Sequence, residues 1–285
     1  MFKHFILTRF NIKFDGIAGF DKNHQFAQTE AWLENRFYLF EKYCFPSIMN
    51  QTCKNFIWFV LFSSDTPERY IQKIKSYELQ FPLFKPLFLE TGDYDTIKKA
   101  SNEAIALYLN DYQYIITSRI DNDDSFHKEM VQEVQKLFNY QKDTFLSFTY
   151  GLQYEIKKKV LARMLYMNNH FISRIEKNSN GIETVLLHDH TYIDKMNDIV
   201  YIKNKHKPMW LEIIHGGNLE NRLFPESVPL FRNKILKTFN LNEKISYVNT
   251  LTLLYKCLKV RALLLRADLR KLDIYDFLKE KIKTQ

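Results

Sequence analysis

Hydrophobic residues in the first half of the chain form short runs that alternate with segments of helical periodicity. The runs at residues 4–10 and 56–62 are largely apolar and bounded by polar residues, as is typical of strands buried on both faces of a sheet. Similar runs predict strands at 86–90, 112–120 and 144–150. None of these runs approaches the roughly 18 residues that a membrane-spanning helix needs.

The segments between these runs predict helices. We expect the first helix to end before Pro46, because the residue before a proline disfavours the helical conformation. The next helix is predicted to start with Thr66 as N-cap and Pro67 at its first position. Two further helices, each with one apolar face, are expected near residues 97–108 and 130–138.

This alternation predicts an α/β fold with a mainly parallel central sheet and right-handed βαβ connections, flanked by helices. Residues 151–207 show less regular patterning and are interpreted as an irregular region. From about residue 231 the chain reads as helical and basic. We therefore predict one α/β domain at residues 1–230 and a basic helical extension at residues 231–285.

The positive net charge of the chain favours anionic binding partners. The net charge of +8 and the pI of about 9.1 suit nucleic acid, an anionic membrane surface or phosphorylated small molecules. Nucleic acid is not expected as a partner, because basic and aromatic residues do not cluster and the sheet should be covered on both faces. The C-terminal leucine stripe fits either peripheral contact with an anionic membrane or packing on the domain.

The N-terminus and the cysteines indicate a compartment. No secretory signal is visible in the first ten residues, and the three cysteines form no paired framework. A reducing environment is the simplest interpretation. We expect the protein in the cytoplasm, with the inner face of the cell membrane as the surface that the C-terminal helices would contact.

The strongest candidate for a functional site is an acidic segment. It contains Asp121, Asp123 and Asp124 and directly follows the fourth predicted strand. Carboxylates so close together repel one another unless a cation or strong hydrogen-bond donors lie nearby. A divalent metal, Mg²⁺ or Mn²⁺, would answer this need and bridge a substrate diphosphate. The position at a strand end favours this interpretation, because ligands of parallel α/β sheets bind there.

The acidic segment has three alternative interpretations: a solvated loop, a calcium-binding loop and a phosphatase site. A solvated loop in which Ser125 caps the next helix is the simplest alternative. A calcium loop starting at Asp121 would need glycine at its sixth position, and Phe126 stands there. A phosphatase of the haloacid dehalogenase type uses a similar segment on its first strand, whereas three predicted strands precede this one. It remains the second enzyme hypothesis.

Three stretches resemble the inverting glycosyltransferases of family 2. They are ILTRFN at residues 6–11, the segment 46–65 with its Gln-Thr turn, and SRIDNDDSF at residues 118–126. Together with Trp32, Arg36, Phe40 and the later Trp210 and HGGN segment, they are most similar to a bacterial rhamnosyltransferase family. This resemblance covers most of residues 1–225.

The resemblance implies a GT-A-type glycosyltransferase fold, a nucleoside-diphosphate sugar donor and a divalent metal. It implies Asp123 as the leading metal ligand, Asp124 as a second ligand or an orienting residue, and Asp121 as a contact of the donor ribose or sugar. His215 would complete the metal site or contact the diphosphate. The family usually reads the nucleotide base with acids just after the second strand, where this chain offers Asp65 slightly later.

Further candidates follow from position. Arg9 and Arg119 lie at predicted strand ends, where a guanidinium can hold diphosphate oxygens. The transfer also needs a group that takes the proton of the acceptor hydroxyl. Asp189 is the preferred candidate for this base, with His190 and Glu183 as alternatives.

The sequence thus predicts a metal-dependent glycosyltransferase. The expected reaction moves a sugar, rhamnose by the family's label, from a nucleoside-diphosphate sugar to a hydroxyl of a bacterial glycan or glycolipid, with inversion. A module that binds nucleotide sugars or glycans without catalysis is the alternative from a different functional class. The sequence itself does not distinguish the sugar, the nucleotide or the acceptor.

Overall fold

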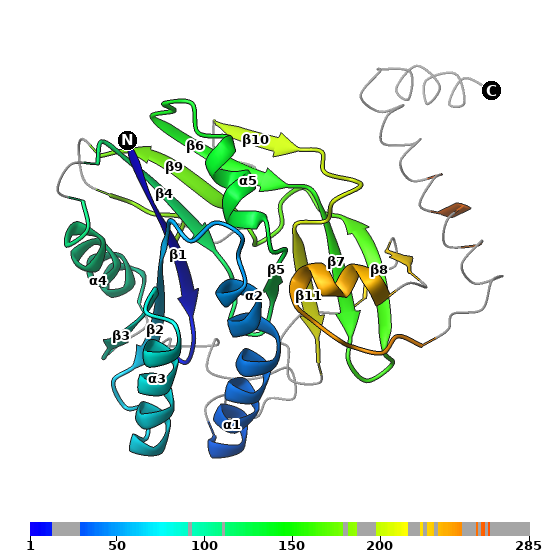
Figure 1. Ribbon diagram of the computed structural model, residues 1–285, viewed down its shortest axis with the longest axis horizontal. Coiled ribbons are helices and arrows are strands. Elements are labelled where there is room, and N and C mark those ends of the chain that lie inside the picture. The colour runs from blue at the N-terminus through cyan, green and yellow to red at the C-terminus, as the bar shows by residue number, and fades with distance from the viewer. Residues whose placement is uncertain are drawn as a thin grey trace, which may run out of the picture.

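Two sheets and their covering helices make up the part of the chain that the structure, a computed structural model, describes (Figure 1). The described residues are 1–12, 29–90, 93–109, 112–178, 182–186, 198–215, 223–224, 227–230 and 233–246, with 255, 258, 259 and 262. The larger sheet has seven strands in the order β10-β6-β9-β4-β1-β2-β3. Its strands are β1 (Phe2–Arg9), β2 (Ile57–Ser63), β3 (Phe84–Leu89), β4 (Tyr114–Arg119), β6 (Asp143–Phe148), β9 (Ser173–Lys177) and β10 (Ile199–Ile202). Only the pairs that involve β9 are antiparallel, so the predicted mainly parallel sheet is confirmed.

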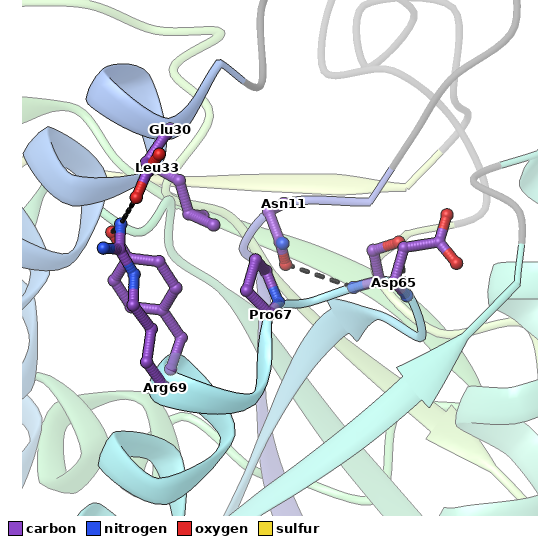
Figure 2. A pocket seen from close by; sticks show the side chains of 8 residues that line it. Asn11, Glu30, Leu33, Asp65, Pro67 and Arg69 are labelled. Atoms are coloured by element: carbon purple, nitrogen blue, oxygen red, sulfur yellow. Dashed lines mark hydrogen bonds and ion pairs between the residues drawn. The ribbon is translucent and has the colours of Figure 1, made fainter.

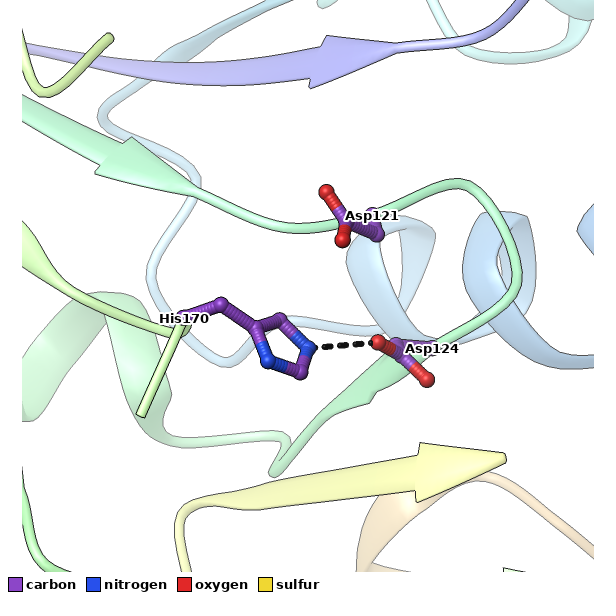
Figure 3. Close-up of side chains that lie close together, drawn as sticks. All are labelled: Asp121, Asp124 and His170. Atoms are coloured by element: carbon purple, nitrogen blue, oxygen red, sulfur yellow. Dashed lines mark hydrogen bonds and ion pairs between the residues drawn. The ribbon is translucent and has the colours of Figure 1, made fainter. Parts of the chain in front are cut away.

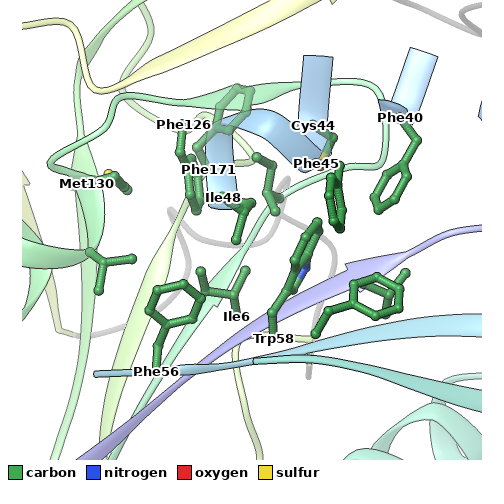
Figure 4. Packing of buried hydrophobic residues seen from close by; sticks show 14 of the residues in the cluster. Ile6, Phe40, Cys44, Phe45, Ile48, Phe56, Trp58, Phe126, Met130 and Phe171 are labelled. Carbon is green, nitrogen blue, oxygen red and sulfur yellow. The ribbon is translucent and has the colours of Figure 1, made fainter. Parts of the chain in front are cut away.

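Both faces of the larger sheet are covered by apolar side chains, which is why its central strands read as continuous hydrophobic runs. Ile6 of β1 belongs to one core, and its neighbours Phe5 and Leu7 belong to the core on the other face. Figure 4 shows the first core, in which Ile6 and Trp58 pack near aromatic rings such as Phe45. Helices α1 (Glu30–Leu39), α2 (Phe45–Met49), α3 (Glu68–Gln80) and α5 (Met130–Lys136) cover the first core, and α4 (Tyr94–Ala106) covers the second.

Two predicted helix boundaries are wrong. The first helix continues through Pro46, because the π-helical segment η2 (Phe40–Cys44) joins α1 to α2 and places the proline in the first turn of α2, where no N–H donor is needed. Thr66 does not cap α3, since its hydroxyl donates to the carbonyl oxygen of Ser63 at 2.6 Å and Pro67 stands at the cap position. The other predicted elements of the first 150 residues agree with the structure to within a few residues.

The irregular region predicted for residues 151–207 is wrong, because it contains β9 and β10 of the larger sheet and much of a second sheet. This sheet has the strand order β12-β8-β7-β11-β5, with β5 (Ser125–Phe126), β7 (Tyr150–Glu155), β8 (Val160–Leu165), β11 (Trp210–Ile214) and β12 (Val228–Pro229). Gly151 lies against the indole of Trp210, and a Cβ atom at residue 151 would stand 2.1 Å from that ring. The Trp210 Nε1–H donates to the carbonyl oxygen of Phe148 in β6 at 2.7 Å, so the indole also ties the two sheets together.

Little of the predicted C-terminal extension is described, and its boundary after residue 230 stays a prediction. The short 3-10 helix η4 (Asn233–Phe239) buries Leu236 and Phe239 in the core of the second sheet. Nearly all residues beyond 246 lie outside the described part, and so does most of the predicted basic helix. Among the described residues, no helix combines the length and the apolar character needed to cross a bilayer.

Candidate active site

The carboxyl ends of β1, β2 and β4 lie side by side, because these strands are parallel neighbours. Strand β4 ends at Arg119, and the acidic segment follows directly, as the sequence predicts. Asp123 and Asp124 are 5% and 1% exposed, and Asp121 is partly buried. Ser125 caps no helix, because its hydroxyl donates to the carbonyl oxygen of Tyr43 at 2.8 Å. Buried carboxylates require cations or donors nearby, and each of the three has its own set.

Asp121 faces arginine side chains. Arg119 donates to Asp121 Oδ1 from Nη2 at 3.3 Å and from Nε at 3.4 Å. Burial would raise the pKa of Asp121, but the guanidinium groups of Arg119 and Arg9 and the imidazole of His170 outweigh burial and hold the pKa well below its ordinary value. Asp121 is therefore ionised at neutral pH. The structure brings the predicted donor residues Arg9, Arg119 and Asp121 to one place.

Asp124 is held by an imidazole and a backbone N–H group. His170 Nε2 lies 2.9 Å from Asp124 Oδ2, and the Ile213 N–H donates to Asp124 Oδ1 at 2.8 Å. Burial and the neighbouring carboxylates of Asp123 and Asp121 raise the pKa of Asp124 well above its ordinary value. The ionised form of this carboxyl would therefore be stabilised by any cation bound beside it.

Asp123 belongs to a separate group of charges. Its Oδ2 atom accepts from Nη1 of Arg36 at 2.8 Å and lies 2.8 Å from Nε2 of His215. Burial raises the pKa of Asp123, but Arg36 and His215 outweigh burial and keep the pKa below its ordinary value. The structure thus joins the predicted residues Asp123 and His215, and it adds Arg36 to them.

Asp121, Asp124 and His170 offer ligand atoms for a metal ion (Figure 3). One carboxylate oxygen from each aspartate and one imidazole nitrogen all lie within 4.8 Å of one another. This donor set fits Mn²⁺, and its oxygen ligands also suit Mg²⁺. Of the predicted metal ligands, the set contains Asp124, whereas Asp123 and His215 form the neighbouring group with Arg36.

The turn after β1 links the acidic segment to the end of β2. The Asn122 amide donates to carbonyl oxygens of the turn, with the shorter bond reaching Phe10 at 2.8 Å. The next residue, Asn11, accepts from the Ser63 N–H at 3.1 Å and donates to Thr66 Oγ1 at 3.0 Å. This line of hydrogen bonds fixes the position of the carboxylates relative to the carboxyl end of β2.

A pocket of about 410 Å³ opens beside this turn (Figure 2). It is lined by Asn11, Glu30, Leu33, Ser63, Asp65, Pro67, Arg69 and Tyr70. Its volume lies within the range of small-molecule sites, about 300–1,000 Å³. Figure 2 shows the Glu30–Arg69 ion pair, 2.6 Å long, on one side of the pocket and the predicted donor residue Asp65 on the other. Apolar and aromatic walls with polar groups at the edge suit a nucleoside-sized ligand.

The Gln-Thr turn that carried the family resemblance supports the acidic segment. Gln51 is 2% exposed, and its amide donates to the carbonyl oxygen of His127 at 2.9 Å and accepts from the Val131 N–H at 3.0 Å. The Thr52 N–H donates to the carbonyl oxygen of Lys128 at 2.7 Å. These bonds tie the residues after the carboxylates to the end of α2, so the two motifs form one structural unit.

Glu212 of β11 is a buried acid close to this site. It is 5% exposed, and it accepts from the Gln153 side chain at 2.6 Å. Burial raises the pKa of Glu212 to about 7, with His170 opposing the shift and Asp124 adding to it. Its one sign in the sequence is that a single acid stands within the apolar run at residues 210–214.

The predicted base Asp189 lies outside the described residues, as does its alternative His190. Glu183, the other alternative, is described, and it accepts from Nη2 of Arg174 at 2.9 Å. An acceptor hydroxyl would have to compete with the Arg174 guanidinium for this carboxylate. The geometry therefore argues against Glu183, and Asp189 stays a prediction.

His170 and Arg36 were not assigned to the site from the sequence. His170 stands between β8 and β9, and 46 positions separate it from Asp124. Arg36 occurs in the helical pattern of α1, where an arginine is typical of a solvated face. The chain fold brings both to the end of β4. No local motif marks His170, and Arg36 entered the sequence analysis only as part of the family resemblance, without a role in the site.

Solved structures offer distant likenesses. S. aureus TarS has 13% sequence identity and a TM-score of 0.41, with 74% of this chain and 37% of that chain covered. S. aureus TarS 1-349 in complex with UDP-GlcNAc has 13% identity and a TM-score of 0.42, with 79% and 62% covered. A "putative nucleotide-diphospho-sugar transferase" from Desulfovibrio desulfuricans G20 has 12% identity and a TM-score of 0.39, with 76% and 84% covered. The chain thus spans less than two thirds of the length of either TarS chain.

A comparison with curated proteins gives no match. The sequence pattern of the family described as "Putative rhamnosyl transferase", in contrast, matches residues 3–227. This range includes every residue of the candidate site named above. The mainly parallel sheet with helices on both faces agrees with the GT-A-type α/β fold that the motifs implied. The chain belongs to this rhamnosyl transferase family, and the family expected from its motifs is thereby confirmed.

Proposed function

We propose that the protein transfers a sugar from a nucleoside-diphosphate sugar to a hydroxyl of a glycan or glycolipid acceptor. Membership of a rhamnosyl transferase family supports sugar transfer, and rhamnose is the sugar that the family's description names. The observation that carries the proposal is a pocket of about 410 Å³ beside a cluster of carboxylates. A nucleoside diphosphate needs both an enclosed place for its nucleoside and cations for its phosphates.

The turn after β1 places these two parts next to each other. Asn11 lines the pocket, and the preceding residue, Phe10, accepts from Asn122 of the acidic segment. A nucleoside in the pocket would therefore direct its diphosphate toward Asp121 and Arg119. Asp65 would contact the nucleoside.

A divalent cation, Mn²⁺ or Mg²⁺, is the proposed cofactor, with Asp121, Asp124 and His170 as its ligands. When bound, it would neutralise charge on the departing diphosphate. The protein prepares these ligands: Arg119 keeps Asp121 ionised, and the Ile213 N–H orients Asp124.

Asp123 and His215 are the second candidate pair of metal ligands. Their side chains lie 2.8 Å apart, but Arg36 already contacts the same carboxylate oxygen. A metal at this pair would have to share Asp123 with the guanidinium. This competition is why the set with His170 is preferred.

The remaining steps extend the proposal to the acceptor. Asp189 would take the proton of the acceptor hydroxyl as that oxygen attacks the sugar, and the diphosphate would leave with the bond's electron pair. Attack opposite the leaving group would invert the configuration at the sugar carbon. The basic C-terminal segment would bring the protein to an anionic membrane where a glycolipid acceptor resides.

A thermal-shift screen tests the donor site. UDP, dTDP, GDP, ADP and CDP are added to wild-type protein with and without Mn²⁺. We expect one of them to raise the melting temperature in a metal-dependent manner, and Asp121→Asn to abolish the shift. Asp95→Asn, an exposed acid in the first turn of α4, is the matched control and should behave as wild type. Absence of any shift in the wild type contradicts the proposal.

The two candidate metal sets are separated by their histidines. His170→Ala should remove the Mn²⁺-dependent part of the shift, whereas His215→Ala should retain most of it. The reverse result would move the metal to Asp123. Turnover of a donor that binds distinguishes a transferase from a module that only binds, and release of free phosphate would point to the phosphatase alternative.

A further inference from the structure

We propose that Arg36 of α1 binds the diphosphate of the donor, an assignment that rests on the proposed function. Neither the family pattern nor the acidic segment assigns a ligand to this residue. With this assignment α1 becomes part of the donor site, and the Arg36 guanidinium offsets part of the charge of the phosphates.

The placement of Arg36 between the pocket and the carboxylates is the first argument. Leu33 of α1 lines the pocket, and Arg36 follows it by three positions, so the two side chains share one side of the helix. At its far end the guanidinium reaches Asp123 at 2.8 Å and Asn122 at 3.3 Å. The guanidinium thus contacts the two residues that follow Asp121, so a diphosphate directed from the pocket toward Asp121 would lie near it.

The hydrogen bonding of Arg36 is the second argument. Both of its hydrogen bonds come from Nη1, and its buried Nε–H has no partner within the part of the chain that the structure describes. Buried donors without partners are rare, because leaving one unsatisfied is unfavourable. A phosphate oxygen is the acceptor that a guanidinium binds best, often through two N–H groups at once.

The rigidity of the side chain is the third argument. The guanidinium lies 5.1 Å from the ring centre of Trp32, one turn earlier on the same helix, and only 14% of the side chain is exposed. Such stacking and burial hold an arginine in one geometry before the ligand arrives, which lowers the entropy lost on binding. Asp123 and Asn122 therefore hold Arg36 in position before the donor binds.

Isothermal titration tests the assignment with two probes, the nucleoside diphosphate that gives the largest thermal shift and its parent nucleoside. Arg36→Gln should weaken the diphosphate about tenfold to hundredfold, the range for a lost charge-assisted hydrogen bond. The same variant should bind the nucleoside within about twofold of wild type, since the nucleoside lacks the phosphates. Arg36→Lys, which keeps the charge but not the planar fork, should fall in between.

Arg163→Gln serves as the matched control, because this arginine lies on β8 and donates to the Lys205 carbonyl oxygen at 3.5 Å. It should bind both probes as wild type does. Equal diphosphate affinity in Arg36→Gln and wild type overturns the role of Arg36 and leaves the donor site intact. A parallel loss of nucleoside affinity also overturns it, since the residue would then shape the pocket alone. Failure of the wild type to bind any diphosphate overturns the proposed function and this assignment with it.

Discussion

The larger and the smaller sheet meet at the same site, yet they bury different kinds of side chain there. Strands β1 and β2 of the larger sheet place apolar groups on both faces. In the smaller sheet, Leu152 and Leu211 lie in an apolar core, whereas the alternate residues Gln153 and Glu212 form a buried polar pair close to the carboxylates. The larger sheet is therefore a scaffold whose strand ends carry the site, and one face of the smaller sheet is a wall of the site.

Gly151 gives the strongest test of how tightly the smaller sheet is packed. A Cβ atom there would stand 2.1 Å from the Trp210 ring, so Gly151→Ala must displace strand or indole. We expect a loss of about 3 kcal/mol or more in the free energy of unfolding, at the upper end of overpacking effects. Urea denaturation measures it, with Lys157→Ala in the exposed turn of the same hairpin as control. A loss below about 1 kcal/mol would show that the smaller sheet yields easily.

Two buried tryptophans allow a matched comparison of the sheets. Trp58 donates to Thr8 Oγ1 at 2.9 Å within the larger sheet, and Trp210 donates to the Phe148 carbonyl at 2.7 Å from the smaller one. Replacing either by Phe should cost about 2–3 kcal/mol through lost volume and a lost hydrogen bond. Only Trp210→Phe should also reduce the nucleotide-dependent thermal shift, because β11 carries Ile213, whose N–H donates to Asp124 of the proposed metal set. Equal ligand shifts in both variants would contradict the division into scaffold and wall.

Two buried histidines predict how acid affects the two regions. Burial lowers the pKa of His4 in β1 to about 3 and that of His127, next to Phe239 of the smaller sheet's core, to about 4. Each is neutral in the folded protein, so its contribution is complete above the unfolded pKa of about 6.5 and is lost as the pH falls. At pH 5 each should account for about 2 kcal/mol of lost stability.

Urea unfolding of His4→Gln and His127→Gln between pH 7 and pH 3.5 measures the contribution of each histidine to the free energy of unfolding. Each variant should show a shallower loss of stability than wild type from pH 6.5 to pH 4. Below pH 4 only the His4 variant should still differ in slope, since His127 is then protonated in both states. A wild-type slope in either variant would contradict the assignment for that histidine.

The smallest effect is expected at the rim of the pocket. Arg69 and Glu30 form an ion pair of 2.6 Å, but their side chains are 53% and 73% exposed. Water and salt screen such pairs, so Glu30→Gln should change the free energy of unfolding by no more than about 0.5 kcal/mol. A larger change in the free energy of unfolding, measured by urea denaturation, would show that this ion pair stabilises the packing of α1 against α3 more than its exposure implies.

The comparison also shows what the sequence could reveal. The five strands of the larger sheet up to residue 148 were predictable because runs such as 56–62 are apolar on both faces, and because a strand end before Asp121 is a strong signal. Its other two strands, β9 and β10, lie in the region that was interpreted as irregular. The strands of the smaller sheet were not predicted, although Gln153 and Glu212 stand between apolar residues as in a half-buried strand. Such alternation indicates a strand with one polar face, and it does not reveal that these two polar side chains are buried against each other.

The candidate site was predictable where its residues stand at the ends of predicted strands. Five residues have such positions at the ends of β1 and β4: Arg9, Arg119, Asp121, Asp123 and Asp124. His215 was found through its glycine-rich neighbours and its contact with Asp123 agrees with a place in the site. His170 required the fold itself, because its distance from the acidic segment along the chain conceals a contact of 2.9 Å.

If the pocket binds the donor as proposed, the hydrogen-bonded turn between Asn122 and Asn11 has a consequence for redesign of the donor preference. Leu33 and Pro67 line the pocket, so their side chains could be exchanged to admit a different base. Asn11 holds the end of β2, and Asn122 holds the turn at the carboxylates. A library that varies either asparagine would change base selection and phosphate geometry together. Engineering should therefore start from the apolar wall and keep both amides.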